Sequence, residues 1–133
     1  MKEFAESKLL GTVLKRFESE GKIIAAICAA PCALATHSIC LGLYRHIFTF
    51  LLLLHRFIGK SLTSYPSMKD KLLDKYNYID DQLFVLDGQL LTSQGPGTAM
   101  LFSLKLAELM VGEATAQEVA KGLLVNTTSY KLD

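Results

Sequence analysis

Apolar residues recur at helical spacing near the N-terminus, between lysines, glutamates and an arginine, at Phe4, Leu9, Leu10, Val13, Leu14 and Phe17. This period predicts an amphipathic helix with one face turned to the core. Gly21 comes after the last of these residues and suits the position that follows a helix end. The next run, Lys22–Cys28, is almost wholly apolar, which is typical of a central strand in a parallel sheet.

The chain is expected to turn sharply after this strand. Pro31 fits the first turn of a helix, where its missing N–H costs nothing, and the helix is expected to reach about Ile39. Cys28 would then stand where a strand turns into a helix, as in the nucleophile elbow of hydrolases, and the helical N–H groups would favour its thiolate. The pattern predicts a nucleophile, although a cysteine after a buried strand is more often an inert core residue.

The segment Cys40–Ile58 has a different character, because its apolar centre, Ile47–Leu54, is flanked by arginine–histidine pairs. A membrane-spanning helix needs about 20 mostly apolar residues, and this centre is far shorter. The sequence favours a helix buried in the protein or under a partner. Membrane contact by an interfacial helix within 41–57 is the less favoured alternative. His46 and His55 would lie on different helical faces, which argues against a metal pair.

Short strands and helices alternate in the rest of the chain. Lys60–Ser64 has the pattern of a strand, Tyr65-Pro66 that of a turn, and Ser67 suits the N-cap of a short helix that contains Met68, Leu72 and Leu73.

Two further strand-like runs, Gln82–Leu86 and Gln89–Ser93, flank Asp87-Gly88, a strong hairpin signal. Thr98 suits the N-cap of a helix that ends at Gly112 and is expected to bury Met100, Leu101, Leu104, Leu106 and Leu109. A last helix, Thr115–Leu124, is expected to turn Val119, Leu123 and Leu124 to the core. Strands alternating with helices predict an α/β sandwich with a mostly parallel sheet.

Composition narrows the possible functions. The 133 residues suffice for one domain, half of them are apolar, and the net charge of +1 comes from interspersed acids and bases, which argues against nucleic-acid binding. The three cysteines, Cys28, Cys32 and Cys40, form an odd set without a secretory signal, which indicates reduced thiols in a cytosol-like compartment. Their spacing does not suit a zinc site, so no metal is expected.

Four blocks of the sequence resemble consecutive blocks of the DJ-1/PfpI family, and within it of its animal branch. They are KIIAAICAAPCALATH, GKSLTSYPSMKDKLL, DGQLLTSQGPGTAM and EVAKGLLV. The resemblance implies a flavodoxin-like α/β sandwich, usually homodimeric, with a nucleophilic and oxidisable cysteine at Cys28. It also implies an enzyme of the glyoxalase III or protein deglycase type, without metal or organic cofactor. Such an enzyme acts on methylglyoxal, other small aldehydes or glycated protein groups, and takes part in the oxidative stress response. The implied locations are the cytoplasm, the nucleus and the mitochondrion.

Departures from the family pattern qualify this expectation. In the family, two preceding βα units carry an acidic partner for the cysteine and a Gly-Gly turn, whereas residues 1–133 match only a partial domain that lacks these units. Residues 40–57 resemble an insertion within it. We therefore expect impaired activity, and a non-enzymatic redox sensor, a chaperone-like protein or an inactive truncated isoform is the alternative.

The resemblance also assigns roles around Cys28. The backbone N–H of Ala29 is the expected oxyanion donor. Tyr65 stands where many relatives carry a histidine proposed as base; a phenol is a poor base near neutral pH, and a packed aromatic ring is an equal alternative. Cys32 is expected to be a small buried side chain, since an i, i+4 pair rarely meets disulfide geometry. The pocket wall is expected to consist of Gln94, in place of a common arginine, with Gly95, Pro96, Gly97 and Thr98.

Overall fold

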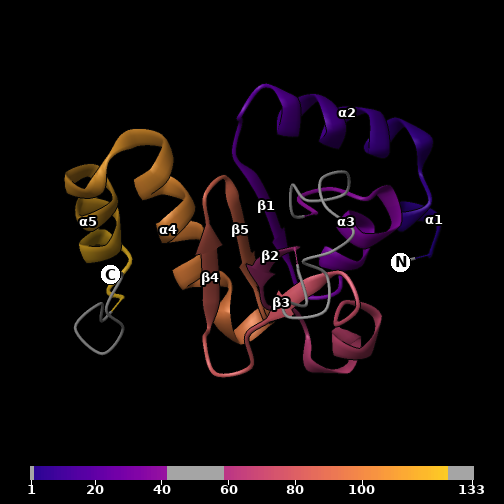
Figure 1. Ribbon diagram of the computed structural model, residues 1–133. Coiled ribbons are helices and arrows are strands. Elements are labelled where there is room, and N and C mark those ends of the chain that lie inside the picture. The colour runs from indigo at the N-terminus through magenta and orange to yellow at the C-terminus, as the bar shows by residue number, and fades with distance from the viewer. Residues whose placement is uncertain (1, 42–58, 126–133) are drawn as a thin grey trace, which may run out of the picture.

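The computed structural model describes residues 2–41 and 59–125 and contains two small sheets with helices around them (Figure 1). The expected insertion at 40–57, with its alternatives of a buried or an interfacial helix, lies almost wholly outside the described residues. No helix in the described ranges is long and apolar enough to cross a membrane. The elements are α1 (Lys2–Ala5), α2 (Lys8–Ser19), β1 (Ile24–Ile27), α3 (Pro31–His37), β2 (Gly59–Leu62), the 3-10 helix η1 (Pro66–Lys71), β3 (Tyr76–Tyr78), β4 (Phe84–Asp87), β5 (Leu90–Ser93), the 3-10 helix η2 (Pro96–Thr98), α4 (Ala99–Val111) and α5 (Glu113–Gly122).

The N-terminal helix is divided in two and ends as predicted. Ser7 separates α1 from α2, and its side chain accepts a hydrogen bond from the Leu10 N–H at 3.3 Å, so it is the N-cap of α2. At the other end Gly21 adopts φ +65°, the Gly21 N–H binds Glu18 O, and the Lys22 N–H binds Phe17 O. These paired bonds define a Schellman motif, which explains the glycine.

The main sheet has the strand order β1-β5-β4. β1 runs parallel to β5, from Ile24 opposite Leu90 to Ile27 opposite Ser93, and β4 and β5 form the predicted antiparallel hairpin. In Figure 1, α4 and α5 lie on one side of this sheet and α2 and α3 on the other, which is the expected α/β sandwich. The neighbouring folds reported below identify it as the flavodoxin-like type.

The prediction that β1 is a central strand is wrong for the described residues, in which only β5 pairs with it. Ile24 and Ala26 are buried, whereas Ala25 between them is exposed. An apolar run indicates that a strand is largely buried, but it does not show how many strands pair with it. The edge of β1 opposite β5 therefore carries backbone groups without a strand partner, which is the kind of edge that promotes pairing with other chains.

A second, two-stranded parallel sheet consists of β2 and β3. β2 follows the prediction closely, whereas β3 was not predicted, although its alternation of tyrosines suits a strand. Side chains of the main sheet bind the backbone of this segment: Asp87 Oδ2 accepts from the Ser61 N–H at 2.7 Å, and Thr92 Oγ1 accepts from the Thr63 N–H at 2.9 Å. The two sheets are thus joined by polar contacts as well as by the core.

The core lies between β1, α3 and the second sheet. Its cluster includes residues from every one of these elements, and the Tyr76 hydroxyl donates to Ile39 O within it. Burial raises the pKa of Tyr76, so this phenol stays protonated. The cluster of buried residues comprises Ile24, Ala26, Leu34, Ala35, Ile39, Cys40, Leu62, Leu72, Tyr76 and Leu90.

Several expected helix contacts differ in the structure. On α5 the buried residues are Ala116 and Ala120, while the larger Val119, Leu123 and Leu124 are exposed. Small alanines let α5 approach α4, and this close packing leaves the bulky residues outside. The N-terminal helices also expose residues that were expected to face the core, namely Phe4, Leu9, Val13 and Phe17. On α4, Met100 was expected to be buried and is exposed.

One capping prediction is wrong, and a second is confirmed in position only. Ser67 lies inside η1, whose N-cap is Tyr65, because Pro66 begins the helix one residue earlier. Thr98 does stand before α4, but its hydroxyl makes no bond to that helix. Instead it binds back to Gly95, as described below.

Candidate functional site

Cys28 stands at the carboxyl end of β1 in a backbone conformation that side chains rarely adopt. Its φ is +64°, although it is not a glycine. Two hydrogen bonds hold it there: the Cys28 N–H donates to Ser93 O at 3.0 Å, and Cys28 O accepts from the Tyr65 N–H at 2.8 Å. Such strained residues cost about 1–3 kcal/mol and concentrate at functional sites. The sharp turn expected after the strand is therefore present.

The turn after Cys28 leaves one N–H free. The Ala30 N–H donates to Ile27 O at 3.1 Å, and the Cys32 N–H donates to Ala29 O at 3.2 Å. The Ala29 N–H has no hydrogen-bond partner among residues 2–41 and 59–125. A free donor beside a thiol suits an oxyanion that forms on a substrate. The role of Ala29 as that donor stays a prediction.

Tyr65 reaches the elbow through its backbone, while its ring lies over the next loop. A Cβ built on Gly95 would be 3.5 Å from Tyr65 Cδ2, so the ring and this glycine are in contact range. The side chain is exposed, and its hydroxyl has no hydrogen bond within the part of the chain that the structure describes. Tyr65 therefore lies beside the site, and its chemical role is untested.

The loop from Gln94 to Thr98 is tied together by one hydroxyl. Thr98 Oγ1 accepts from the Gly95 N–H at 3.0 Å and lies 2.6 Å from Ser93 Oγ. Ser93 in turn accepts the Cys28 N–H, so the loop and the elbow share a strand end. The Gln94 side chain donates to Asp80 O at 3.2 Å. Gly95 and Thr98 are buried and Pro96 and Gly97 are exposed, and their place in a pocket wall stays a prediction.

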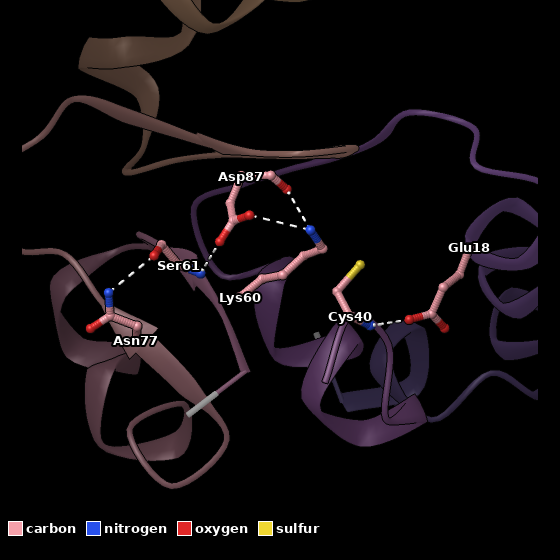
Figure 2. Close-up of polar contacts among 6 residues, drawn as sticks. All are labelled: Glu18, Cys40, Lys60, Ser61, Asn77 and Asp87. Carbon is pink, nitrogen blue, oxygen red and sulfur yellow. Dashed lines mark hydrogen bonds and ion pairs between the residues drawn. The ribbon is translucent and has the colours of Figure 1, made fainter. Parts of the chain in front are cut away.

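Asp87 has a role that the hairpin signal did not reveal. Besides the Ser61 N–H, its carboxylate binds Lys60 Nζ at 3.2 Å, and the same ammonium donates to Asp87 O at 3.1 Å (Figure 2). Partial burial alone would raise the pKa of Asp87, but the Ser61 N–H and the Lys60 charge outweigh it and lower the pKa. This ion pair fixes β2 on the hairpin and thus positions Tyr65, which follows β2. The only sequence signal for it was an acid before the hairpin glycine.

The other two thiols have different surroundings. Cys40 is buried, and its N–H donates to Glu18 Oε1 at 2.6 Å (Figure 2). Burial, together with the charge of Glu18, raises the pKa of Cys40 to about 11, so it is protonated near neutral pH. Cys32 is half-buried, and burial raises its pKa as well, against the opposing charge of Lys71.

Some groups that the chemistry would use are not found beside Cys28. Cys28 Sγ makes no hydrogen bond or ion pair within residues 2–41 and 59–125, so no carboxylate there pairs with it. The same ranges hold no cluster of histidine, cysteine and acidic side chains suited to a metal. The site as described offers a strained half-buried thiol, a free N–H and an aromatic ring.

Known proteins resemble the chain in sequence and in fold. Residues 48–109 match the DJ-1/PfpI family. Drosophila melanogaster protein dj-1beta is 51% identical over 90% of this chain and 55% of its own length, and Caenorhabditis elegans glutathione-independent glyoxalase DJR-1.2 is 31% identical over 91% of this chain and 55% of its own. The crystal structure of Drosophila DJ-1beta superposes with a TM-score of 0.80 at 49% identity, covering 94% of this chain and 58% of that one. The chain thus spans a little over half the length of these relatives.

The agreement in sequence extends over both sides of the elbow, and the agreement in fold includes the sheet that holds Cys28. Both comparisons point to the same group of animal proteins as the sequence blocks did. The chain belongs to the DJ-1/PfpI family, in its animal DJ-1 branch.

Proposed function

We propose that this protein uses Cys28 as a nucleophile toward small reactive carbonyls, as a glyoxalase and protein deglycase of the DJ-1 type. The observation that supports this most directly is the strained elbow, in which Ser93 and Tyr65 hold Cys28 at φ +64° beside the free N–H of Ala29. The name of the nematode relative, a glutathione-independent glyoxalase, agrees with this reaction class.

The chemistry begins with addition of the Cys28 thiolate to the aldehyde carbon of methylglyoxal. A bond forms between Sγ and carbon, the carbonyl electron pair moves to oxygen, and the oxyanion takes a proton to give a hemithioacetal. The Ala29 N–H stabilises the oxyanion. An internal shift of hydrogen between the two carbons, followed by hydrolysis, gives lactate, so that methylglyoxal and water are the only reactants consumed. In a glycated side chain, the bond between the aldehyde carbon and the side-chain nitrogen or sulfur breaks as the carbonyl re-forms, the side chain leaves as free amine or thiol, and the released aldehyde then adds to Cys28 in the same way.

The rate of lactate formation depends on a general base that moves the hydrogen between the two carbons. General acid–base catalysis contributes about 10²–10⁴-fold, and no carboxylate in the described ranges pairs with Cys28. Tyr65 is beside the elbow, but a phenol is a weak base at neutral pH. We therefore expect turnover by this chain to be slow.

Oxidation sensing is the second candidate function, and the half-buried, unpaired thiol favours it. This chemistry needs only a thiolate and a peroxide: Sγ attacks one oxygen, the O–O bond breaks, and sulfenic acid and hydroxide form. A further peroxide gives sulfinic acid. The sensor needs neither an acid partner nor a base.

The test measures lactate released from methylglyoxal by the wild-type chain, by Cys28→Ser and by Cys32→Ser as a matched thiol control. We expect slow lactate formation in the wild type and in Cys32→Ser, and none above the buffer rate in Cys28→Ser. Equal rates in all three proteins would refute the enzymatic proposal. Mass spectrometry after peroxide treatment then decides the second function: oxygen atoms added at Cys28 without turnover indicate a sensor, and an unmodified Cys28 excludes one.

The assembly and location follow from the same proposal. We propose a homodimer, as in the family, located in the cytoplasm and also in the nucleus and the mitochondrion. Sedimentation velocity across a range of protein concentrations tests the dimer, and a single species of monomer mass would contradict it. Fractionation of cells that express a tagged chain tests the locations.

A further inference from the structure

A cavity of about 420 Å³ is lined by residues of α1, α3 and η1 and by Glu6, which follows α1. The residues that line it include Cys32, Met68 and Thr36. Neither Cys28 nor Tyr65 contributes to it, so it is separate from the elbow. Its size is within the range of ordinary small-molecule sites, about 300–1,000 Å³.

The rim of the cavity carries an unusual set of charges. Lys2 and Lys71 contribute two ammonium groups, and Glu6 contributes one carboxylate. None of the three takes part in an ion pair or a side-chain hydrogen bond within residues 2–41 and 59–125. Lys71 is close enough for its charge to act on the Cys32 sulfur, where it partly opposes the effect of burial. Cys32 thus lines a space whose other lining residues include two lysines and one glutamate.

We infer that this cavity binds one half of a low-molecular-weight disulfide that carries two carboxylates and one ammonium group, and that Cys32 forms a mixed disulfide with it. The charges match one to one: the ligand carboxylates pair with Lys2 and Lys71, and its ammonium pairs with Glu6. Met68 provides an apolar contact for the methylene next to the ligand sulfur, because thioethers adapt to irregular surfaces.

The exchange reaction is balanced without any other reactant. The Cys32 thiolate attacks one sulfur of the disulfide, a new S–S bond forms, and the old bond breaks. The second half leaves as a thiolate and takes a proton from water. The disulfide is the oxidant: the Cys32 sulfur is oxidised and the leaving sulfur is reduced. A thiol with a raised pKa is less ionised near neutral pH but is the stronger nucleophile once ionised, so the rate rises with pH.

The experiment uses two probes, glutathione disulfide and the uncharged bis(2-hydroxyethyl) disulfide. All three cysteines lie in one tryptic peptide, between Lys22 and Arg45, so the peptide mass alone does not locate the adduct and variants are used to assign it. Intact mass of the Cys28→Ser protein follows adduct formation at Cys32 or Cys40, and the Cys28→Ser/Cys32→Ser protein is the blank. We expect one adduct per chain in the first protein and none in the second, because Cys40 is buried.

The measured quantity is the rate constant with glutathione disulfide divided by that with bis(2-hydroxyethyl) disulfide. Both rate constants are proportional to the thiolate fraction of Cys32, so this fraction cancels in the ratio. We expect glutathione disulfide to be favoured in the folded protein and the preference to disappear in urea. In the Cys28→Ser background, Lys71→Gln and Lys2→Gln should each lower the ratio about two- to fivefold, which is the strength of exposed ion pairs. Lys15→Gln, on an exposed part of α2, is the matched control and should leave it unchanged.

Three results would overturn the inference. They are equal ratios in folded and unfolded protein, adduct formation that persists without Cys32, and lysine variants that cannot be distinguished from Lys15→Gln. The first comparison needs no lysine variant, so it decides the question even if one of them folds poorly. The outcome does not depend on Cys28, so failure here would leave the proposed carbonyl chemistry untouched.

Discussion

Gly11, in the first part of α2, is a position where helix propensity and packing predict opposite effects of one substitution. Replacing an exposed helical glycine with alanine stabilises a helix by up to about 1 kcal/mol. Gly11, however, is buried, and a Cβ built on it would lie 2.3 Å from His37 Nδ1 and 2.7 Å from His37 Cε1. Distances this short require the imidazole ring or the helix to move.

His37 has little freedom to make room. It lies in the last turn of α3 and is only partly exposed, and its Nε2 is buried without a hydrogen-bond partner among residues 2–41 and 59–125. The sequence did not predict its close approach to Gly11. Overpacking of this kind costs about 1–3 kcal/mol. The penalty exceeds the gain in propensity, and we expect Gly11→Ala to lower the free energy of unfolding by about 1 kcal/mol.

A double-mutant cycle separates the two effects. In a His37→Ala background the obstacle is absent, so Gly11→Ala should stabilise the protein by up to about 1 kcal/mol, which gives a coupling energy of about 2 kcal/mol. Urea unfolding of the four proteins, followed by circular dichroism, measures it. If Gly11→Ala stabilises the protein in both backgrounds, the packing argument is wrong.

The remaining predictions concern polar contacts around the two sheets. Asp87→Asn removes the ion pair with Lys60 and should destabilise the protein by about 0.5 kcal/mol at neutral pH, since the pair is partly exposed and screened. Because the folded-state pKa of Asp87 is lowered, the stability difference between wild type and Asp87→Asn is complete above the unfolded pKa of about 3.9 and is lost as the pH falls through the folded pKa. Urea titrations at a series of pH values measure this dependence. A stability difference that persists in strong acid would contradict it. Thr98→Val leaves the buried Gly95 N–H without its acceptor and should cost about 1–3 kcal/mol in the same assay, whereas Thr98→Ser should retain most of the stability.

Local signals in the sequence predicted the features that a few neighbouring residues determine. Gly21 ends α2 because its φ of +65° suits glycine, Asp87-Gly88 turns the hairpin with Gly88 at +61°, and Pro31 begins α3. Each of these depends on backbone preferences that one or two residues express by themselves.

Features that depend on distant residues were missed. The carboxylate of Asp87 reaches Ser61 across 26 positions of the chain, and no local pattern encodes that contact. The exposure of Val119 follows from how closely α5 approaches α4, which the alanines of α5 determine only once both helices are present. The period of apolar residues predicts that a helix has an apolar face, and the packing of the neighbouring helix determines how much of that face is buried.

The hydrogen bonds that bend the backbone at Cys28 also determine when the site can form during synthesis. Cys28 leaves the ribosome early, but its N–H can bind Ser93 O, and its carbonyl can accept from the Tyr65 N–H, only after those residues have been synthesised. Chains are made at about 5–20 residues per second, so a nascent chain carries this thiol for several seconds before β5 can dock beside β1. During that interval Cys28 is an ordinary cysteine on an extended chain. The bend at Cys28 is therefore completed near the end of translation, and a chain that terminates before β5 would contain the cysteine without the hydrogen bond to Ser93.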